Sequence, residues 1–184
     1  MMTSAEMVRD RSTDSSDGAG LPIRFGVGDC SLGSILVATT DRGICAILLG
    51  DDPETLLRDL EDCFADAQLF RDGQALEQLI AEVVAFVANP TSCLDLPLDP
   101  RGTPFQRRVW QALRKIPAGS RASYGEIARR IGAPKEAYAV GEACAANPIA
   151  VAIPCHRVVR KDGGLGDYRW GFARKRALLR REGL

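Results

Sequence analysis

The sequence has little of what several classes of protein require. Its single histidine, His156, leaves no second imidazole for a zinc site, and its six cysteines include no Cys-X-X-Cys pair. No apolar run approaches the ~18 residues of a membrane span, and no apolar stretch near the N-terminus is typical of a signal peptide. We therefore expect no bound metal, no cofactor and no membrane contact, and we expect a reduced, intracellular compartment.

The net charge of the whole 184-residue chain is zero, but its two halves carry opposite charges. Residues 1–100 hold 6 Lys+Arg and 18 Asp+Glu, a net charge of −12, whereas residues 101–184 hold 18 and 6, a net charge of +12. The basic half could contact nucleic acid or another anionic surface, or the two oppositely charged halves could dock on each other. The 46% hydrophobic content is that of a globular protein, and the length suits one large domain or two small ones.

The acidic half predicts an α/β domain over residues 21–98. Residues 1–20 are polar and cannot bury enough surface to order, so we expect a disordered tail there. Apolar runs on both sides of Asp41-Arg42-Gly43, between residues 33 and 50, predict a β-hairpin. The remaining elements are predicted as a helix that begins at Asp52-Pro53-Glu54 with Leu56, Leu57, Leu60 and Phe64 inward, a helix over residues 75–88, and a strand over residues 94–98.

The basic half, residues 99–184, predicts a mainly α-helical domain. Capping boxes begin helices at Thr103 and at Ser123, and a turn at Gly132-Ala133-Pro134 precedes a further helix over residues 135–146. A helix, a short glycine-containing turn and a helix are typical of a helix-turn-helix, although any αα-corner has the same pattern. The candidate phosphate contacts are Arg107, Arg108, Arg114, Arg121, Arg129, Arg130 and Lys135.

The segment from Pro154 to Arg157 holds the most chemically suggestive residues. It places the Cys155 thiol beside the only imidazole of the chain, with a guanidinium next to it. A neighbouring base or positive charge favours the thiolate, which is the nucleophilic form of cysteine. Taken alone, the same pair is also explained by a buried cysteine on an apolar strand beside a chance histidine, and adjacent residues on a strand point to opposite faces.

Flanking motifs carry a resemblance to a known family. The segments GTPFQRRVWQAL, SYGEIA, NP followed by PCHRVVR, DYRWG and LLRREG resemble the O6-alkylguanine-DNA alkyltransferase family, and most closely the C-terminal half of its Ada-type members. The resemblance covers about residues 21–184. It implies a ribonuclease-H-like N-terminal domain and a winged-helix-like C-terminal domain with the helix-turn-helix. It also implies that an alkyl group passes once, irreversibly, from O6-alkylguanine, with O4-alkylthymine a further candidate, to a cysteine.

The resemblance implies a role for each matching residue. Cys155 corresponds to the alkyl acceptor, His156 to the residue that draws the thiol proton through a water, and Glu182 to the carboxylate that orients the histidine. Asn147 corresponds to the hinge between helix and active-site loop, and Tyr124 to the tyrosine that hydrogen-bonds guanine N3. From the residues alone, Glu182 would be a solvated helix-terminal carboxylate neutralised by neighbouring arginines, Asn147 a helix C-cap, and Tyr124 a packing residue.

Substrate and DNA contacts are implied in the same way. The expected substrate-binding residues are Val158, through its carbonyl, Pro154, and Tyr168 and Arg169 as a lid. The expected partner is double-stranded DNA, bound in the minor groove by a monomer in the bacterial cytoplasm, at the nucleoid, with the damaged base flipped into the pocket. The expected DNA-binding residues are Tyr138, Arg121, Lys135, Arg129 and Gly141.

Three features depart from the family pattern. Tyr138 stands where the family carries an arginine that fills the gap left by the flipped base; a tyrosine can stack there but lacks the charge and the forked donors. Asp167 puts a negative charge before the lid tyrosine. The Cys-rich and transcription-factor modules of Ada-type proteins have no counterpart in the sequence, so their functions are not expected. Tyr138 leaves open an alternative function, a lesion-binding or regulatory DNA module with impaired flipping.

Overall fold

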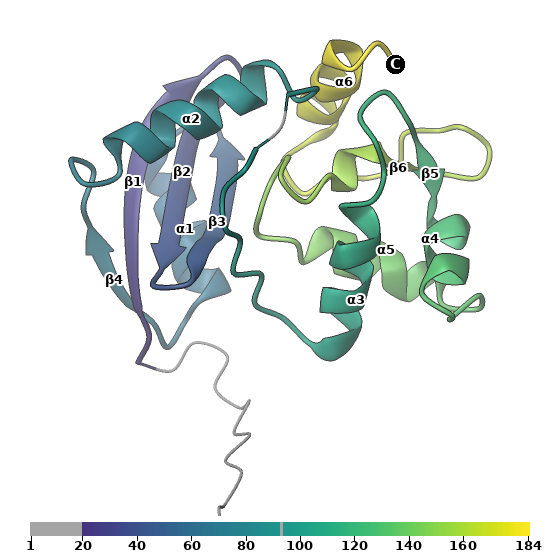
Figure 1. Cartoon of the computed structure of the whole chain (residues 1–184), viewed down its shortest axis with the longest axis horizontal. Coiled ribbons are helices and arrows are strands. Elements are labelled where there is room, and N and C mark those ends of the chain that lie inside the picture. The colour runs from purple at the N-terminus through teal and green to yellow at the C-terminus, as the bar shows by residue number, and fades with distance from the viewer. Residues whose placement is uncertain (1–19, 93) are drawn as a thin grey trace, which may run out of the picture.

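The computed structural model describes residues 20–92 and 94–184. It has a four-stranded sheet with two helices on one side of the molecule and a mainly helical part on the other (Figure 1). This confirms the predicted pairing of an α/β half with a mainly α half. The tail predicted over residues 1–20 lies, apart from Gly20, outside the described residues. In the described ranges no helix is long and apolar enough to cross a membrane.

The N-terminal sheet has the strand order β3-β2-β1-β4. Strands β1 (Pro22–Cys30), β2 (Gly33–Thr40) and β3 (Gly43–Gly50) form an antiparallel meander, which confirms the hairpin around residues 41–43. The short strand β4 (Gln68–Arg71) pairs with β1 in parallel. Neither β1 nor β4 was predicted.

Helices α1 (Pro53–Cys63) and α2 (Glu77–Ala88) cover opposite faces of this sheet (Figure 1). Both were predicted, and the Asp52 side chain caps α1 by accepting a hydrogen bond from the Thr55 backbone N–H. Because both faces are covered, β2 and β3 are almost continuously buried rather than alternating. Helix α2 comes so close to β1 at Gly26 that a Cβ there would lie 2.7 Å from Cδ1 of Ile80.

The prediction of a strand over residues 94–98 is wrong. Residues 94–97 are irregular, and Leu98 forms only an isolated bridge with Ile44. The Ile44 N–H donates to the Pro97 carbonyl at 2.9 Å, and the Asp99 N–H donates to the Ile44 carbonyl at 2.8 Å. Pro97 has no N–H with which to extend this ladder toward the N-terminal side, so the pairing does not continue there beyond the one bridge.

The C-terminal half contains helices α3 (Pro104–Leu113), α4 (Tyr124–Arg130), α5 (Ala137–Ala145) and α6 (Phe172–Arg181). Both predicted capping boxes are present, at Thr103 and at Ser123. Helices α4 and α5, joined by a six-residue turn, are the predicted helix-turn-helix pair. The 3₁₀ turn η1 (Cys155–Arg157) leads into β6 (Val158–Val159), which pairs in parallel with β5 (Ala122–Ser123).

Trp110 connects the first of these helices to the helix-turn-helix. Its side chain is 1% exposed, and its indole Nε1–H donates to the Ala143 carbonyl of α5 at 2.8 Å. The indole thereby fills the space between α3 and α5 and satisfies a buried backbone acceptor.

We predict that Trp110→Phe lowers the free energy of unfolding by about 1–2 kcal/mol, because the Ala143 carbonyl loses its partner and a small cavity forms. Chemical denaturation followed by circular dichroism measures this. Gln111→Ala, at the exposed next position of α3, is the control and should change the value by less than about 0.5 kcal/mol. Equal stability of Trp110→Phe and the unaltered protein would contradict the assignment.

Candidate active site

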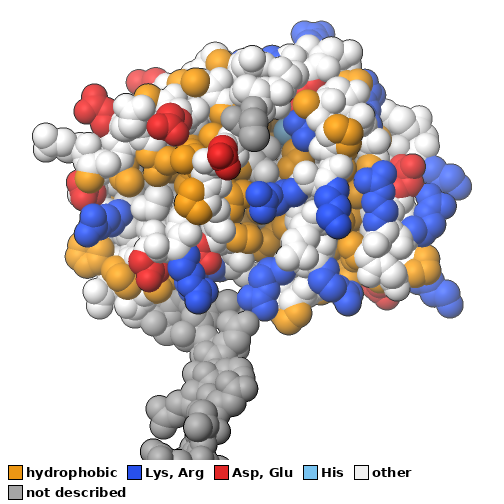
Figure 2. Space-filling model, in the orientation of Figure 1, with side chains coloured by type: hydrophobic (Ala, Val, Ile, Leu, Met, Phe, Trp, Pro, Cys, Tyr) orange, Lys and Arg blue, Asp and Glu red, His pale blue; other side chains and the backbone are white. Residues whose placement is uncertain are grey.

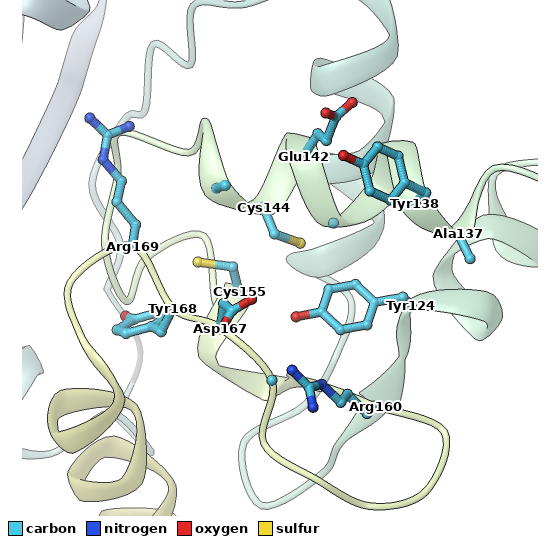
Figure 3. A pocket seen from close by; sticks show the side chains of 13 residues that line it. Tyr124, Ala137, Tyr138, Glu142, Cys144, Cys155, Arg160, Asp167, Tyr168 and Arg169 are labelled. Atoms are coloured by element: carbon cyan, nitrogen blue, oxygen red, sulfur yellow. The ribbon is translucent and has the colours of Figure 1, made fainter.

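Cys155 lies at the wall of a cavity of about 570 Å³ between α4, α5 and the loop that follows β6 (Figure 3). The thiol is on the 3₁₀ turn η1, not on a strand, and the residue is 3% exposed. The cavity is lined by Tyr124, Ala137, Tyr138, Gly141, Glu142, Cys144, Ala145, Cys155, Arg160, Gly166, Asp167, Tyr168 and Arg169.

The Asn147 side chain holds the thiol in place. Asn147 is fully buried, and its Nδ2 donates to the Ile153 carbonyl at 3.0 Å and to Sγ of Cys155 at 3.3 Å. Its Oδ1 accepts a hydrogen bond from the Ile149 N–H at 2.9 Å. Asn147 therefore does more than end a helix, because one amide fixes both the turn after α5 and the sulfur atom.

Glu182 joins His156 to Arg157 beneath the cavity. Its Oε1 lies 2.8 Å from Nε2 of His156 and 2.8 Å from Nη2 of Arg157. Arg157 also donates to the carbonyls of Ile116 and Pro90. Glu182 is 8% exposed, so the interpretation as a solvated terminal carboxylate is wrong: neighbouring arginines on α6 do not neutralise it, whereas a buried guanidinium does.

These contacts set the protonation states at neutral pH. Burial raises the pKa of the Cys155 thiol to about 11, against the opposing effects of the Asn147 hydrogen bond and the Lys175 charge. Burial also lowers the pKa of His156, despite the Glu182 carboxylate. Burial alone would raise the pKa of Glu182, but the hydrogen bonds from His156 and Arg157 outweigh this effect and hold the pKa at about 2. The resting site thus has a neutral thiol, a neutral imidazole and a carboxylate.

Three buried polar atoms have no hydrogen-bond partner among the described residues: Nδ1 of His156, Oη of Tyr168 and Nε1 of Trp170. Their rings pack edge to face in sequence, with centroids 6.5 Å apart for His156 and Tyr168 and 5.2 Å apart for Tyr168 and Trp170. Because Nε2 of His156 faces Glu182, Nδ1 is the nitrogen that remains able to exchange a proton.

Tyr124 forms the wall opposite the thiol, with its hydroxyl directed into the cavity (Figure 3). Burial is the main effect that raises its pKa to about 12, so the hydroxyl remains a donor. The loop that follows β6 passes close to it at Gly166, where φ is +69° and a Cβ would lie 3.0 Å from the Tyr124 hydroxyl. Glycine therefore lets the loop approach the tyrosine.

Lys175 is a buried residue to which the sequence assigned no role. It is 0% exposed, and its Nζ donates to the carbonyls of Val158 at 2.6 Å, Leu165 and Asp167. The ammonium therefore holds the loop that follows β6 against that strand. Lys175, Leu178, Leu179 and Glu182 follow helical spacing on one face of α6, and charged residues on an apolar face are a signal that could have indicated a buried role.

The expected substrate-binding residues are not all at the cavity. Tyr168 and Arg169 line it, but Val158 and Pro154 are not among the described residues that do. Val158 is buried and its carbonyl accepts from Lys175, whereas Pro154 borders a separate hollow beside Arg157. Their contact with a substrate stays a prediction.

The expected DNA-binding residues lie on the helix-turn-helix side. Tyr138, at the start of α5, is 81% exposed at the mouth of the cavity, and Gly141 follows one turn later. Arg121, Arg129 and Lys135 are exposed before, on and after α4. In Figure 2 most lysine and arginine side chains on the visible face lie over this half of the molecule. Within residues 20–92 and 94–184, no group of three or more His, Cys, Asp or Glu side chains is placed to hold a metal ion.

Comparisons with known protein families cover both halves of the chain. The profile described as "6-O-methylguanine DNA methyltransferase, ribonuclease-like domain" matches residues 23–100. The profile described as "6-O-methylguanine DNA methyltransferase, DNA binding domain" matches residues 104–184.

Individual relatives agree with these profiles. The chain is 52% identical over 165 residues to the Escherichia coli "Bifunctional transcriptional activator/DNA repair enzyme Ada", covering 90% of this chain and 47% of Ada. It therefore spans about half the length of that relative. It is 46% identical over 130 residues to a Mycobacterium bovis methylated-DNA–protein-cysteine methyltransferase, covering 70% of this chain and 79% of the relative. The crystal structure of Mycobacterium tuberculosis OGT in complex with DNA superposes with a TM-score of 0.73 at 37% identity, over 86% of this chain and 92% of that one.

Glu182 gives this site a measurable pH dependence. A pKa lowered from 4.5 to about 2 corresponds to about 3 kcal/mol of stability, present above the unfolded-state pKa and lost as the pH falls through the folded-state pKa. We predict that Glu182→Gln lowers the free energy of unfolding by about 3 kcal/mol near pH 7. The difference from the unaltered protein should shrink between about pH 4.5 and pH 2.

Denaturant unfolding at a series of pH values measures this difference. Glu142→Gln, which changes an exposed carboxylate at the cavity mouth, is the control and should change stability by less than about 0.5 kcal/mol. A difference for Glu182→Gln that is independent of pH would show that the loss comes from packing and not from the buried charge.

Proposed function

Because the chain belongs to the 6-O-methylguanine DNA methyltransferase family, we propose that it repairs DNA by moving an alkyl group from the O6 atom of guanine to Cys155. The transfer is stoichiometric and irreversible, so each molecule acts once. The observation that carries this proposal is the thiol of Cys155 at a cavity of about 570 Å³, with the His156–Glu182 pair beneath it and the Tyr124 hydroxyl opposite.

The proposed reaction needs one proton transfer, from the thiol, and one hydrogen bond to the departing purine. In the methyl case, sulfur forms a bond to the methyl carbon as the bond from that carbon to O6 breaks, and the bonding electrons pass to the purine. The thiol, whose pKa is about 11 in the empty site, gives its proton through a water to Nδ1 of His156, while Glu182 holds Nε2 and stabilises the imidazolium. Tyr124 keeps its proton and donates a hydrogen bond to N3 of the departing guanine, where negative charge develops. The thioether that remains on Cys155 has no leaving group, which ends the reaction.

Access to the cavity requires that the base leave the duplex. An enzyme that acts on a base inside DNA turns the nucleotide out into a pocket, and this cavity opens beside α5 of the helix-turn-helix. We propose that a monomer binds the minor groove through Arg121, Arg129 and Lys135, that Gly141 lets the backbone approach, and that Tyr138 occupies the gap left by the flipped base. The proposed place of action is the bacterial cytoplasm, at the nucleoid.

The alternative is a protein that binds lesions without repairing them. Its support is Tyr138, which is exposed and lacks the charge and forked donors of an arginine. The repair function is favoured over it because the relatives identical at 46–52% are named as methyltransferase or repair enzyme.

We predict that incubation with duplex DNA containing O6-methylguanine adds the mass of one methyl group to the protein, on the peptide that contains Cys155. Intact-protein and peptide mass spectrometry measure this. Cys155→Ser should gain no methyl group, whereas Cys144→Ser, which changes the neighbouring thiol of the same cavity, should still be methylated at Cys155. Binding of lesion-containing DNA with no change in mass would support the alternative function.

We predict that Tyr138→Arg speeds methylation of Cys155 by duplex DNA by roughly 10-fold, since extrusion of the base costs a few kcal/mol that the arginine can offset. Its reaction with free O6-methylguanine should change by less than about 2-fold, because the free base needs no extrusion. Tyr138→Phe, which retains the ring, is the control and should behave as the unaltered protein. Equal acceleration on both substrates would show that residue 138 acts on the chemistry and not on flipping.

A further inference from the structure

Arg169 joins three parts of the molecule that are distant in sequence. Its Nη1 donates to the carbonyl of Ala146 at 3.3 Å and to that of Asn147 at 3.4 Å, just after α5. Its Nη2 donates to Sγ of Cys63, at the end of α1, at 2.9 Å. The guanidinium also lies over the ring of Trp170, 5.9 Å from the centroid. In Figure 3 the side chain of Arg169 points away from Tyr124 and from the centre of the cavity.

These contacts converge on the residue that holds the reactive sulfur. The carbonyl bound by Arg169 belongs to Asn147, whose Nδ2 donates to Sγ of Cys155. The backbone directly after Asn147 is held by the sheet, because the Ile47 N–H of β3 donates to the Pro148 carbonyl and the Ala150 N–H donates to the Ile47 carbonyl, each at 2.9 Å. The N-terminal half thus supports Asn147 by backbone bonds on one side and by a side-chain bridge on the other.

We propose that Arg169 is a positioning residue that transmits the placement of α1 to the Cys155 thiol, through Cys63 on one side and Asn147 on the other. The proposal rests on the function proposed above and gives the N-terminal half a part in it. The geometry favours this role over a phosphate contact, because both Nη atoms already donate to protein acceptors, which hold the guanidinium against the protein. A thiol is a weak acceptor, so the bridge is adjustable and its loss should weaken the placement of Asn147 without unfolding the protein.

The experiment compares Arg169→Ala, Cys63→Val and the double variant, with Cys63→Ser retaining an acceptor. The first readout needs no DNA: the pH dependence of carbamidomethylation of Cys155 by iodoacetamide, followed on its own peptide. Because the Asn147 hydrogen bond lowers the pKa of the thiol, its misplacement should move the half-maximal pH upward. The charge of Arg169 also lowers that pKa directly, so the upward shift in Cys63→Val, which keeps this charge, is the result that reports the bridge. The second readout is the maximal rate of methylation by saturating O6-methylguanine duplex, which should fall about 3- to 10-fold, the range expected for one hydrogen bond.

The double variant and a matched control decide the outcome. If one bridge carries the effect, the double variant should equal the stronger single variant, and Cys63→Ser should restore the profile. Arg174→Ala removes another link to the N-terminal half, since Arg174 donates to the Leu32 carbonyl and the Asp51 carboxylate. Its remaining bond is to the Trp170 carbonyl, four residues earlier, and it does not contact Asn147. It should leave the iodoacetamide profile unchanged.

Additive effects, an unchanged profile in Arg169→Ala, or an equal shift in Arg174→Ala would overturn the proposal. A loss of DNA affinity with an unchanged profile and an unchanged maximal rate would identify Arg169 as a phosphate contact instead, which also overturns it. Failure of the unaltered protein to become methylated would refute the proposed function, and the iodoacetamide profiles would still test the bridge.

Discussion

The carboxylate of Glu182 is the interaction on which the arrangement of the active site depends. A buried carboxylate is unfavourable unless its charge is balanced and its oxygen atoms are hydrogen-bonded. Glu182 meets both conditions through His156 and Arg157, and the Gly119 N–H lies 3.3 Å from Oε2. Arg157 in turn donates to the carbonyl of Ile116, in the turn after α3, and to that of Pro90, after α2. One charge pair therefore joins the end of α6, the turn that bears the thiol and both halves of the chain. The histidine is therefore oriented by a contact that also maintains the fold.

The protonation state of the Cys155 thiol also depends on this arrangement. The sequence suggested that a neighbouring base or cation would make Cys155 a thiolate, but burial dominates and the resting thiol stays protonated. A neutral thiol in a cavity beside a neutral imidazole is protected from unwanted electrophiles. In the reaction proposed above, the thiolate forms as the proton passes to Nδ1 of His156 and the carbon–oxygen bond breaks. The low exposure of Cys155 thus contributes selectivity, and the hydrogen bond from Asn147 limits how far burial raises the pKa.

The sequence predicts the elements with strong local signals and misses those defined by distant partners. Capping boxes at Thr103 and Ser123 and the hairpin turn at residues 41–43 are encoded within a few residues, and they are present. Strand β1 was missed because Gly26 and Gly28 interrupt its pattern; their lack of side chains matters only because Ile80 of α2 packs there. Cys155 and His156 were found because they are adjacent, whereas Glu182 and Asn147 needed a family resemblance. The role of Lys175 was missed because its partners are backbone carbonyls, which every residue has and which the sequence therefore does not identify.

The opposite charges of the two halves can now be separated into two effects. The opposite charges contribute in part to the contact between the two halves, since Arg174 of α6 forms an ion pair with Asp51 at 2.6 Å. Yet the arginines at the junction mostly donate to neutral acceptors: Arg157 to Pro90, Arg181 to Val87 and Ser31, and Arg174 to Leu32. Arginine suits such contacts because its donors are fixed and its charge is only weakly hydrated. Arg121, Arg129 and Lys135 are exposed before, on and after α4, away from these junction contacts, so their positive charge remains available on the helix-turn-helix side of the molecule. Glu142 and Asp167 border that opening, so favourable electrostatics must come from the surrounding helices and not from the rim of the cavity itself.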